Sequence, residues 1–428
     1  MFRTGVGLKC QPCSQPATVP LSARVRAKRF PLVLGLAGLA AVVAAAVVFT
    51  LTSSGKSGPV RQPLPPLGAW SELPDLASVR GTAAAVVLRD GKVLVAGGGV
   101  GSIALGGAEV FDQGSGKWSG VASLTLPRRG HRGVVLNDGR VLIAGGIAEG
   151  ELLASAEVYE PASGRWVATA PMSMPRLGHS LTLLADGRVL SAGGTVPGGD
   201  GVAGSAQTIL PSASAEIYDP VAGRWTPAAS MGSPRFEQTA TALPDGRVLM
   251  TGGLGPAGDR IGPLSTTELY DPPVNAFVRS TDLKEARTNH SAAVLSDGSV
   301  LVVGGAGGMN GDISVSSTEV FDPRQGTWTS AGALAESRAG HSAIALADGR
   351  VLVTGGESVA RGARRSLASA EVFDAGARAW RSAGQMACSR SEHDAVRLGD
   401  GTILVVAGDA TFPGAAPIAR SCVSRYEP

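Results

Sequence analysis

Residues 338–380 read RAGHSAIALADGRVLVTGGESVARGARRSLASAEVFDAGARAW. The stretch contains an apolar run, an Asp-Gly pair, a second apolar run that ends in two glycines, a Glu-Val-Phe-Asp segment and a Trp. A two-residue Asp-Gly loop between apolar runs predicts a β-hairpin with a type I′ turn, in which both loop residues have positive φ. The pair occurs seven times, at Asp90, Asp138, Asp186, Asp245, Asp297, Asp348 and Asp400.

Each copy is predicted to form four short strands. Strand a precedes the Asp-Gly pair, strand b follows it, strand c carries the Glu-Val-Phe-Asp segment and strand d starts at the Trp. A four-stranded antiparallel unit that repeats about every 50 residues is typical of a propeller blade. We assign a structural role, packing in the wide outer part of each blade, to Trp70, Trp118, Trp166, Trp225, Trp328 and Trp380.

The two ends of the repeat region complement each other. The seventh copy stops after its strand c, at residues 425–428, and lacks a strand d. Trp70 precedes Arg80 with the spacing seen between the other Trp and Arg residues of the repeat. We therefore predict that residues 67–76 pair with the C-terminal strand and close a ring of seven blades, which removes two open sheet edges.

The order of paired glycines, then Tyr or Phe before Asp, then Trp resembles the Kelch repeat family, over residues 67–428. The resemblance implies an all-β, seven-bladed propeller like the central domain of galactose oxidase. It also implies a binding face made by the loops between strands b and c and between strand d and the next strand a. Members of this family do not share one activity, so the fold alone does not assign a function.

Three segments precede the repeats. Residues 1–30 form a basic cytoplasmic leader, and residues 31–51 are uncharged and long enough for a transmembrane signal-anchor helix. Residues 52–66 are a flexible Gly/Ser/Pro linker to the propeller at 67–428. We expect an inner-membrane anchor with the propeller in the periplasm or outside the cell, or a secreted protein if the leader is cleaved.

The charge distribution argues against a nucleic-acid partner. The whole chain has a formal net charge of +3, and residues 1–50 hold six bases and no acid, so the remainder carries 3 − 6 = −3. The basic balance therefore belongs to the leader and not to the folded part.

Two residue types recur where chemistry could occur. All five histidines stand three residues after a repeat arginine, which we interpret as a structural position and not as a metal site. The seven arginines are expected to ring one mouth of the central channel, and six of them are expected to be neutralised by the Glu of strand c. Arg390, whose Glu position is Ser424, is expected to be free to bind a ligand, and Arg235 and Arg338 are further candidate ligand-binding residues.

Galactose oxidase chemistry is not expected. Its copper radical site needs tyrosines and histidines drawn together, whereas the four tyrosines here all occupy strand c. We predict no cofactor and no metal.

The loop between strands b and c is longest in the third copy, where it spans 195–215 and has an apolar tip at Ile209 and Leu210. Because specificity usually resides in loops on a rigid scaffold, these two residues are candidate ligand contacts. Cys388 and Cys422 both lie on the loop face of the seventh blade, and we predict a disulfide between them.

These patterns predict a monomeric, non-catalytic extracytoplasmic scaffold that binds a protein or a glycan. The alternative is an enzyme acting on a small sugar or sugar acid at the channel mouth, as the sialic-acid mutarotases of this fold do. A purely structural spacer also remains open. An uncompensated cluster of His, Arg and Glu at one mouth would favour the enzyme, and neutralised repeat pairs would favour the scaffold.

Overall fold

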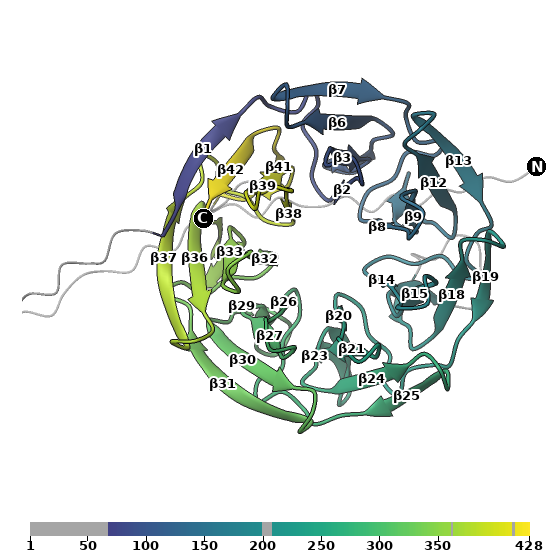
Figure 1. Ribbon diagram of the computed structural model, residues 1–428. Coiled ribbons are helices and arrows are strands. Elements are labelled where there is room, and N and C mark those ends of the chain that lie inside the picture. Colours follow the sequence, from purple (N-terminus) through teal and green to yellow (C-terminus); the bar gives the residue numbers. More distant parts are fainter. Residues whose placement is uncertain (1–66, 199–207, 361–362, 413–415) are drawn as a thin grey trace, which may run out of the picture. The chain divides into compact units, whose positions relative to one another are not determined.

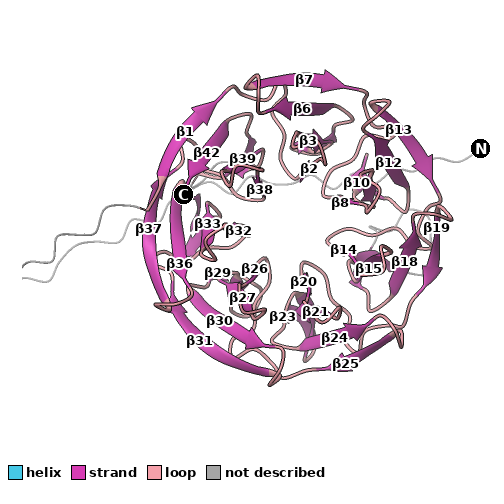
Figure 2. Cartoon of the chain, in the orientation of Figure 1, coloured by secondary structure: helices cyan, strands magenta, loops and turns pink. Residues whose placement is uncertain are grey.

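The computed structural model describes residues 67–198, 208–360, 363–412 and 416–428. In these ranges the chain forms strands and turns, and it has no helix with the length and apolar character to cross a bilayer. The predicted leader, signal-anchor and linker at 1–66 lie outside the described residues. The strands build seven four-stranded antiparallel sheets arranged around a central axis (Figures 1 and 2).

Each blade is given in the order from the axis outward. Blade one is β2 (Ala84–Val87), β3 (Val93–Ala96), β6 (Ala108–Asp112) and β7 (Lys117–Val121). Blade two is β8 (Arg132–Val135), β9 (Val141–Ala144), β12 (Ala156–Glu160) and β13 (Arg165–Thr169). Blade three is β14 (Ser180–Leu183), β15 (Val189–Ala192), β18 (Ala215–Asp219) and β19 (Arg224–Pro227). Blade four is β20 (Thr239–Ala242), β21 (Val248–Thr251), β24 (Thr267–Asp271) and β25 (Ala276–Arg279).

The remaining blades follow the same order. Blade five is β26 (Ser291–Val294), β27 (Val300–Val303), β30 (Ser317–Asp322) and β31 (Thr327–Ala333). Blade six is β32 (Ser342–Ala345), β33 (Val351–Thr354), β36 (Ser369–Asp374) and β37 (Ala379–Gln385). Blade seven is β38 (Asp394–Arg397), β39 (Ile403–Val406), β42 (Val423–Glu427) and β1 (Ala69–Leu73).

A small hairpin follows strand b in every blade. These b–c hairpins are β4–β5 (Gly99–Val100, Ile103–Ala104), β10–β11 (Ile147–Ala148, Glu151–Leu152), β16–β17 (Thr195–Gly198, Thr208–Pro211), β22–β23 (Leu254–Ala257, Arg260–Pro263), β28–β29 (Ala306–Gly307, Ile313–Ser314), β34–β35 (Glu357–Ala360, Ala363–Ser366) and β40–β41 (Asp409–Ala410, Ile418–Ala419). They lie on the face where strand a begins, because strands a and b are antiparallel.

The predicted closure of the ring is confirmed. Strand β1 pairs with β42, with Trp70 opposite Tyr426, so the last blade takes its outer strand from the N-terminal side of the repeats. In Figure 1 the purple β1 lies beside the yellow β42. The seam between blades seven and one is also bonded, since the Gly408 amide donates to the Arg80 carbonyl at 3.1 Å.

The Asp-Gly turns form hairpins as predicted, but the predicted turn type is wrong. In the first copy the Gly91 amide donates to the Leu88 carbonyl, and the Leu88 amide donates to the Lys92 carbonyl. Gly91 has φ +84°, whereas Asp90 is not among the residues with positive φ. The loop is thus a type I turn followed by one left-handed glycine. The Asp90 carboxylate instead accepts a hydrogen bond from the Lys92 amide at 3.1 Å.

The core lies between blades. Strand b is buried along its whole length in every blade, because both of its faces are covered by neighbouring sheets. The aromatic residue of strand c packs on the aromatic residue of strand d, with ring centroids 4.7–5.1 Å apart. Several tryptophans also bond an adjacent blade; Trp328 Nε1, for example, donates to the Thr281 carbonyl at 2.9 Å.

Candidate site at the channel mouth

The repeat arginines are buried inside the blades and do not ring the channel. All seven are at most 1% exposed. In six blades the guanidinium forms an ion pair with the Glu of strand c in the same blade, at 2.8–3.0 Å. The Nη1 atom also donates to one backbone carbonyl just after strand b and to one near the start of strand c, as Arg338 does to Gly355 at 2.6 Å and to Ser369 at 3.0 Å. The expectation that these arginines surround the mouth of the channel was wrong. Their side chains point into the blade, where they donate hydrogen bonds to buried backbone carbonyls.

The three arginines singled out as ligand candidates follow this pattern in part. Arg235 and Arg338 pair with Glu268 and Glu371. Arg390 has no carboxylate partner among the described residues, yet it is 0% exposed. Its Nη1 donates to two carbonyls and its Nη2 to Cys422 Sγ at 2.9 Å. A ligand could reach any of the three only if a blade opened.

The histidine position is a contact between blades. In five of the six Gly-Gly pairs a Cβ placed on the first glycine would come within 2.5–3.0 Å of a His Cε1 in the next blade, as for Gly97 and His131, and in the remaining pair Gly193 would meet Gln238 Nε2 at 2.7 Å. Blade one has Ala83 at the histidine position. The blade that contacts it, blade seven, has Ala407 at the position of the first glycine. Burial lowers the pKa of His131, His290 and His393 to about 3, so these rings are neutral.

A cavity of about 620 Å³ lies at the axis, on the face that carries the b–c hairpins. It is lined by the residues that follow each repeat arginine, up to the first residues of strand a. Bridges such as Arg129–Ile147 hold these segments against the start of each b–c hairpin. A volume of this size is typical of small-molecule sites.

The residue two positions after each repeat arginine has a left-handed backbone in all seven blades. It is glycine in three blades: Gly130, Gly178 and Gly340, with φ of 60–68°. In the other four it carries a side chain at φ of 48–54°: Thr82, Glu237, Asn289 and Glu392. Such a backbone costs a residue other than glycine or asparagine about 1–2 kcal/mol, and strained positions of this kind cluster at functional sites.

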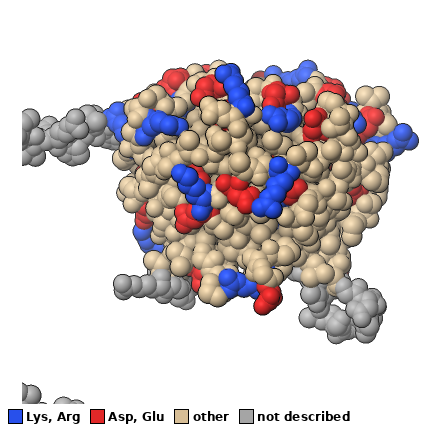
Figure 3. Space-filling view, turned by 90° about the horizontal axis from the view of Figure 1, so that it is seen from below, with Lys and Arg blue, Asp and Glu red and all other residues tan. Residues whose placement is uncertain are grey.

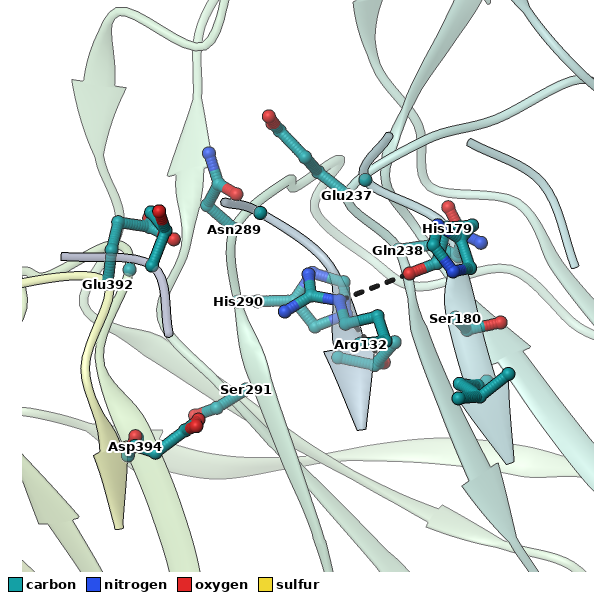
Figure 4. A pocket seen from close by; sticks show the side chains of 18 of the residues that line it. Arg132, His179, Ser180, Glu237, Gln238, Asn289, His290, Ser291, Glu392 and Asp394 are labelled. Atoms are coloured by element: carbon teal, nitrogen blue, oxygen red, sulfur yellow. Dashed lines mark hydrogen bonds between the residues drawn. The ribbon is translucent and has the colours of Figure 1, made fainter. Parts of the chain in front are cut away.

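Backbone bonds link these positions around the channel. The amide of Glu392 donates to the carbonyl of Gly340, and that of Gly340 to Asn289, both at 2.8 Å. A Cβ on Gly340 would overlap Glu392 Oε1, so the carboxylate lies over that glycine. Glu237, Asn289 and Glu392 are shown together in Figure 4. Because blades four and seven are three positions apart in a ring of seven, the two glutamates face each other across much of the channel.

The carboxylates at the mouth are incompletely compensated. Removal from bulk water raises the pKa of Glu392 to about 7, and the negative charge of Glu237 adds to this. Burial also raises the pKa of Glu237 and of Asp394. The Glu392 side chain is exposed, but to the enclosed channel, where protein surrounds it and solvation is weaker than at an outer surface.

Arg132 supplies the opposing charge. It is exposed in the channel, and its Nε donates to the His179 carbonyl at 3.1 Å. No carboxylate of the described residues lies within ion-pair distance of it, although its charge lowers the pKa of Glu237, Glu392 and Asp394 from a distance. Among the described residues, the lining of the mouth thus includes the Arg132 guanidinium, the carboxylates of Glu237, Glu392 and Asp394, and the amides of Gln238 and Asn289.

Sequence reasoning did not select these residues. The usable signal was the position two residues after the repeat arginine, where glycine alternates with Thr, Glu and Asn. The loop candidates lie elsewhere: Leu210, in β17, is 46% exposed, and the side chain of Ile209 is outside the described residues. The structure joins Cys388 and Cys422 in a disulfide on the hairpin face of blade seven.

Comparison with known proteins finds Kelch motifs in three of the repeats. A model described as Kelch motif matches residues 80–125, 128–173 and 287–334. The chain therefore carries Kelch motifs in its seven-bladed propeller. It is 32% identical over 143 residues to an F-box/kelch-repeat protein of Arabidopsis thaliana (33% of this chain, 37% of the relative) and 28% identical over 155 residues to human Kelch-like protein 34 (34% and 24%). The matches therefore span well under half of these relatives.

Solved structures are similar to this chain over most or all of its propeller. A fungal alcohol oxidase of the AA5 family, in complex with copper, aligns with a TM-score of 0.66 at 17% identity, over 84% of this chain and 76% of its own. YjhT aligns with a TM-score of 0.54 at 17% identity, over 72% and 99%. Galactose oxidase of Gibberella zeae is 31% identical over 86 residues, which is 20% of this chain and 11% of that protein.

The residues of this propeller do not fit a copper site of that kind. Its four tyrosines are at most 3% exposed, and each packs in strand c against the aromatic residue of strand d, away from the channel. Among the described residues no group of three or more His, Cys, Asp and Glu is placed to hold a metal ion.

Proposed function

We propose that this Kelch propeller is a non-catalytic binding scaffold that acts outside the cytoplasm and holds a glycan at the channel mouth of its b–c and d–a loop face. Kelch propellers commonly bind proteins, and a protein partner on the surrounding hairpins is the other form of the same scaffold. The apolar segment at 31–51 and the Cys388–Cys422 disulfide support an exported, membrane-anchored location, since disulfides persist in oxidising compartments.

One observation carries the proposal. Glu237, Asn289 and Glu392 keep side chains at a left-handed position where three other blades have glycine. Folding alone would favour glycine at all seven positions, because glycine adopts this backbone without steric cost. Side chains retained there against a cost to stability are best explained by a ligand in the cavity that they line. Carboxylates and an amide are suited to the hydroxyl groups of a sugar.

The test is a glycan-array and pull-down screen with the full-length chain, compared with a Glu237→Gly, Glu392→Gly variant. Binding that is lost in the variant while the fold is kept supports the channel mouth as the site. The matched control is Arg188→Ala, at an Asp-Gly turn on the opposite face, which leaves the mouth intact. Equal binding by all three proteins would exclude the channel mouth and leave the hairpins as the binding surface.

A second function is favoured by one specific observation. A carboxyl with a pKa near 7 is suited to general acid–base catalysis, and Glu392 has this property. Arg132 could hold the carboxylate of a sugar acid, so an enzyme that interconverts sugar anomers is the alternative. Exchange NMR of reducing sugars and sugar acids, with and without the chain, tests it. An interconversion rate that the protein does not change refutes the enzyme and leaves the scaffold.

The distribution of charged side chains in Figure 3 supports a scaffold that does not bind nucleic acid. On the edge of the propeller shown there, Lys and Arg side chains are interspersed with Asp and Glu, and no large patch of one sign is present. We expect a monomer, which light scattering on the purified chain would check.

A further inference from the structure

Blade seven departs from the other six at its repeat arginine. In blade six the Arg338 Nη2 atom donates to Glu371 Oε1 at 2.9 Å and to Ser369 Oγ at 3.2 Å. Blades two to five repeat this arrangement with a Ser or Thr hydroxyl and a Glu. The guanidinium is thus buried with one neutral and one charged acceptor.

In blade seven both acceptors are changed. The strand pairing puts Ser424 at the position of Glu371, since Ser424 lies opposite Val405 and Glu371 opposite Val353. Cys422 consequently takes the position of the Ser hydroxyl, and its Sγ lies 2.9 Å from Arg390 Nη2. A fully buried guanidinium therefore has a sulfur as its only Nη2 acceptor among the described residues.

The disulfide partner is also a repeat position. Cys388 stands two residues before Arg390, where blade six has Glu336, and Glu336 accepts a hydrogen bond from Ser369 Oγ at 3.0 Å. The disulfide replaces this hydrogen-bonded pair, and with it the carboxylate near the arginine.

Within the described part of the chain, no carboxylate lies within ion-pair distance of Arg390. The pKa of Arg390 is lowered to about 10, first by burial and then by the positive charge of Arg420, with Asp75 opposing from a distance. The Nε atoms of Arg390 and Arg420 and the Oγ of Ser424 are buried without hydrogen-bond partners. The site is electropositive, and no anion of the described residues pairs with Arg390.

We propose that Cys388–Cys422 is an exchange site for a dithiol partner, with Cys422 as the leaving thiolate that supplies the anion missing beside Arg390. A thiolate of the dithiol attacks Cys388 Sγ, the S–S bond breaks, and its electron pair leaves on Cys422. The second thiolate of the dithiol then attacks its own sulfur in the mixed disulfide and releases Cys388, which takes up a proton. The dithiol is oxidised by two electrons and the protein is reduced by two.

The electrostatics set the direction of attack. Thiol–disulfide exchange is faster when the leaving thiol has the lower pKa, and a neighbouring cation lowers a thiol pKa below its usual value of about 8.5. Arg390 contacts Cys422, so attack at Cys388 is favoured. Both cysteines are partly exposed, so a reductant can approach from the hairpin face. This proposal is independent of the glycan site.

The test is the reduction equilibrium of the full-length chain against oxidised and reduced dithiothreitol, read by alkylation and mass spectrometry. Ser424→Glu restores the carboxylate present in six blades, and Ser424→Gln adds similar bulk without charge. We expect Ser424→Glu to make the disulfide about tenfold harder to reduce, because the arginine then has its anion in both redox states. Ser424→Gln should differ little from the wild type.

Equal equilibria for Ser424→Glu and Ser424→Gln would overturn the proposal. If Ser424→Glu does not fold, the two thiols of the reduced wild-type chain provide the test. The pH at which the alkylation rate of Cys422 is half its maximum should lie at least about one pH unit below the corresponding pH for Cys388. Identical pH profiles for the two thiols would refute the role of Arg390.

Discussion

Replacement of Glu392 by glycine should stabilise the propeller. Glu392 has φ +52°, a conformation that costs a residue other than glycine about 1–2 kcal/mol. Glycine removes this cost but loses about 0.5–1 kcal/mol of backbone entropy on folding. The net gain is therefore about 0–1.5 kcal/mol, with a midpoint of about 0.75 kcal/mol, although most single substitutions destabilise a protein.

The charge of Glu392 also changes the free energy of unfolding, by an amount that depends on pH. Its folded-state pKa of about 7 lies above the ordinary value of 4.5, so the folded protein binds this proton more tightly. The resulting destabilisation is absent below pH 4.5, grows as the pH rises, and is complete above pH 7. Water in the channel screens the side chain, so we limit this part to less than about 1 kcal/mol.

Thermal unfolding of the full-length chain at pH 5 and pH 8 separates the two contributions. Glu392→Gln keeps the strained backbone and removes only the charge, so it should raise Tm at pH 8 and have little effect at pH 5. Glu392→Gly should raise Tm at both pH values, by about 1–2 °C for the backbone part. A lower Tm for Glu392→Gly at both pH values would refute the strain argument and, with it, the main support for the channel site.

Two further predictions concern the repeat. Glu371→Ala leaves the Arg338 guanidinium buried without its anion and should lower the free energy of unfolding in urea by about 3–5 kcal/mol. The control Arg350→Ala breaks an exposed ion pair with Asp348 and should lower it by less than about 1 kcal/mol. Similar losses for the two variants would contradict the buried pairing. Gly355→Ala places a Cβ 2.8 Å from His393 Cε1 at φ +57°, whereas Gly91→Ala has φ +84° with no atom within 4 Å. Gly355→Ala should therefore lower Tm clearly more than Gly91→Ala, and equal effects would argue against the Gly–His contact between blades.

Much of the fold was predictable because it repeats. Seven Asp-Gly pairs with an Arg and a Gly at fixed offsets set the strand order and the number of blades. The position of Trp70 relative to Arg80 predicted the strand exchange that closes the ring, and the pairing of Trp70 with Tyr426 confirms it. The turn type was mispredicted, because dipeptide preference does not reveal that the loop includes the residue before Asp.

The burial of the arginines also needed the structure. The sequence places the repeat arginine just before strand a, close to the mouth of the channel. It does not show whether the side chain points into the channel or into the blade. Two carbonyls and a carboxylate inside the blade outweigh solvation by water in the channel, so the guanidinium turns inward.

The sequence by itself determined the architecture, since the spacing of glycines, aromatic residues and the repeat arginine specifies one blade and repeats it seven times. Only the tertiary structure decided which side chains meet at the axis. Arg132, Glu237, Asn289 and Glu392 come from four different blades and are up to about 260 residues apart in the chain. They share a cavity because closure of the ring brings the same position of every blade to the centre.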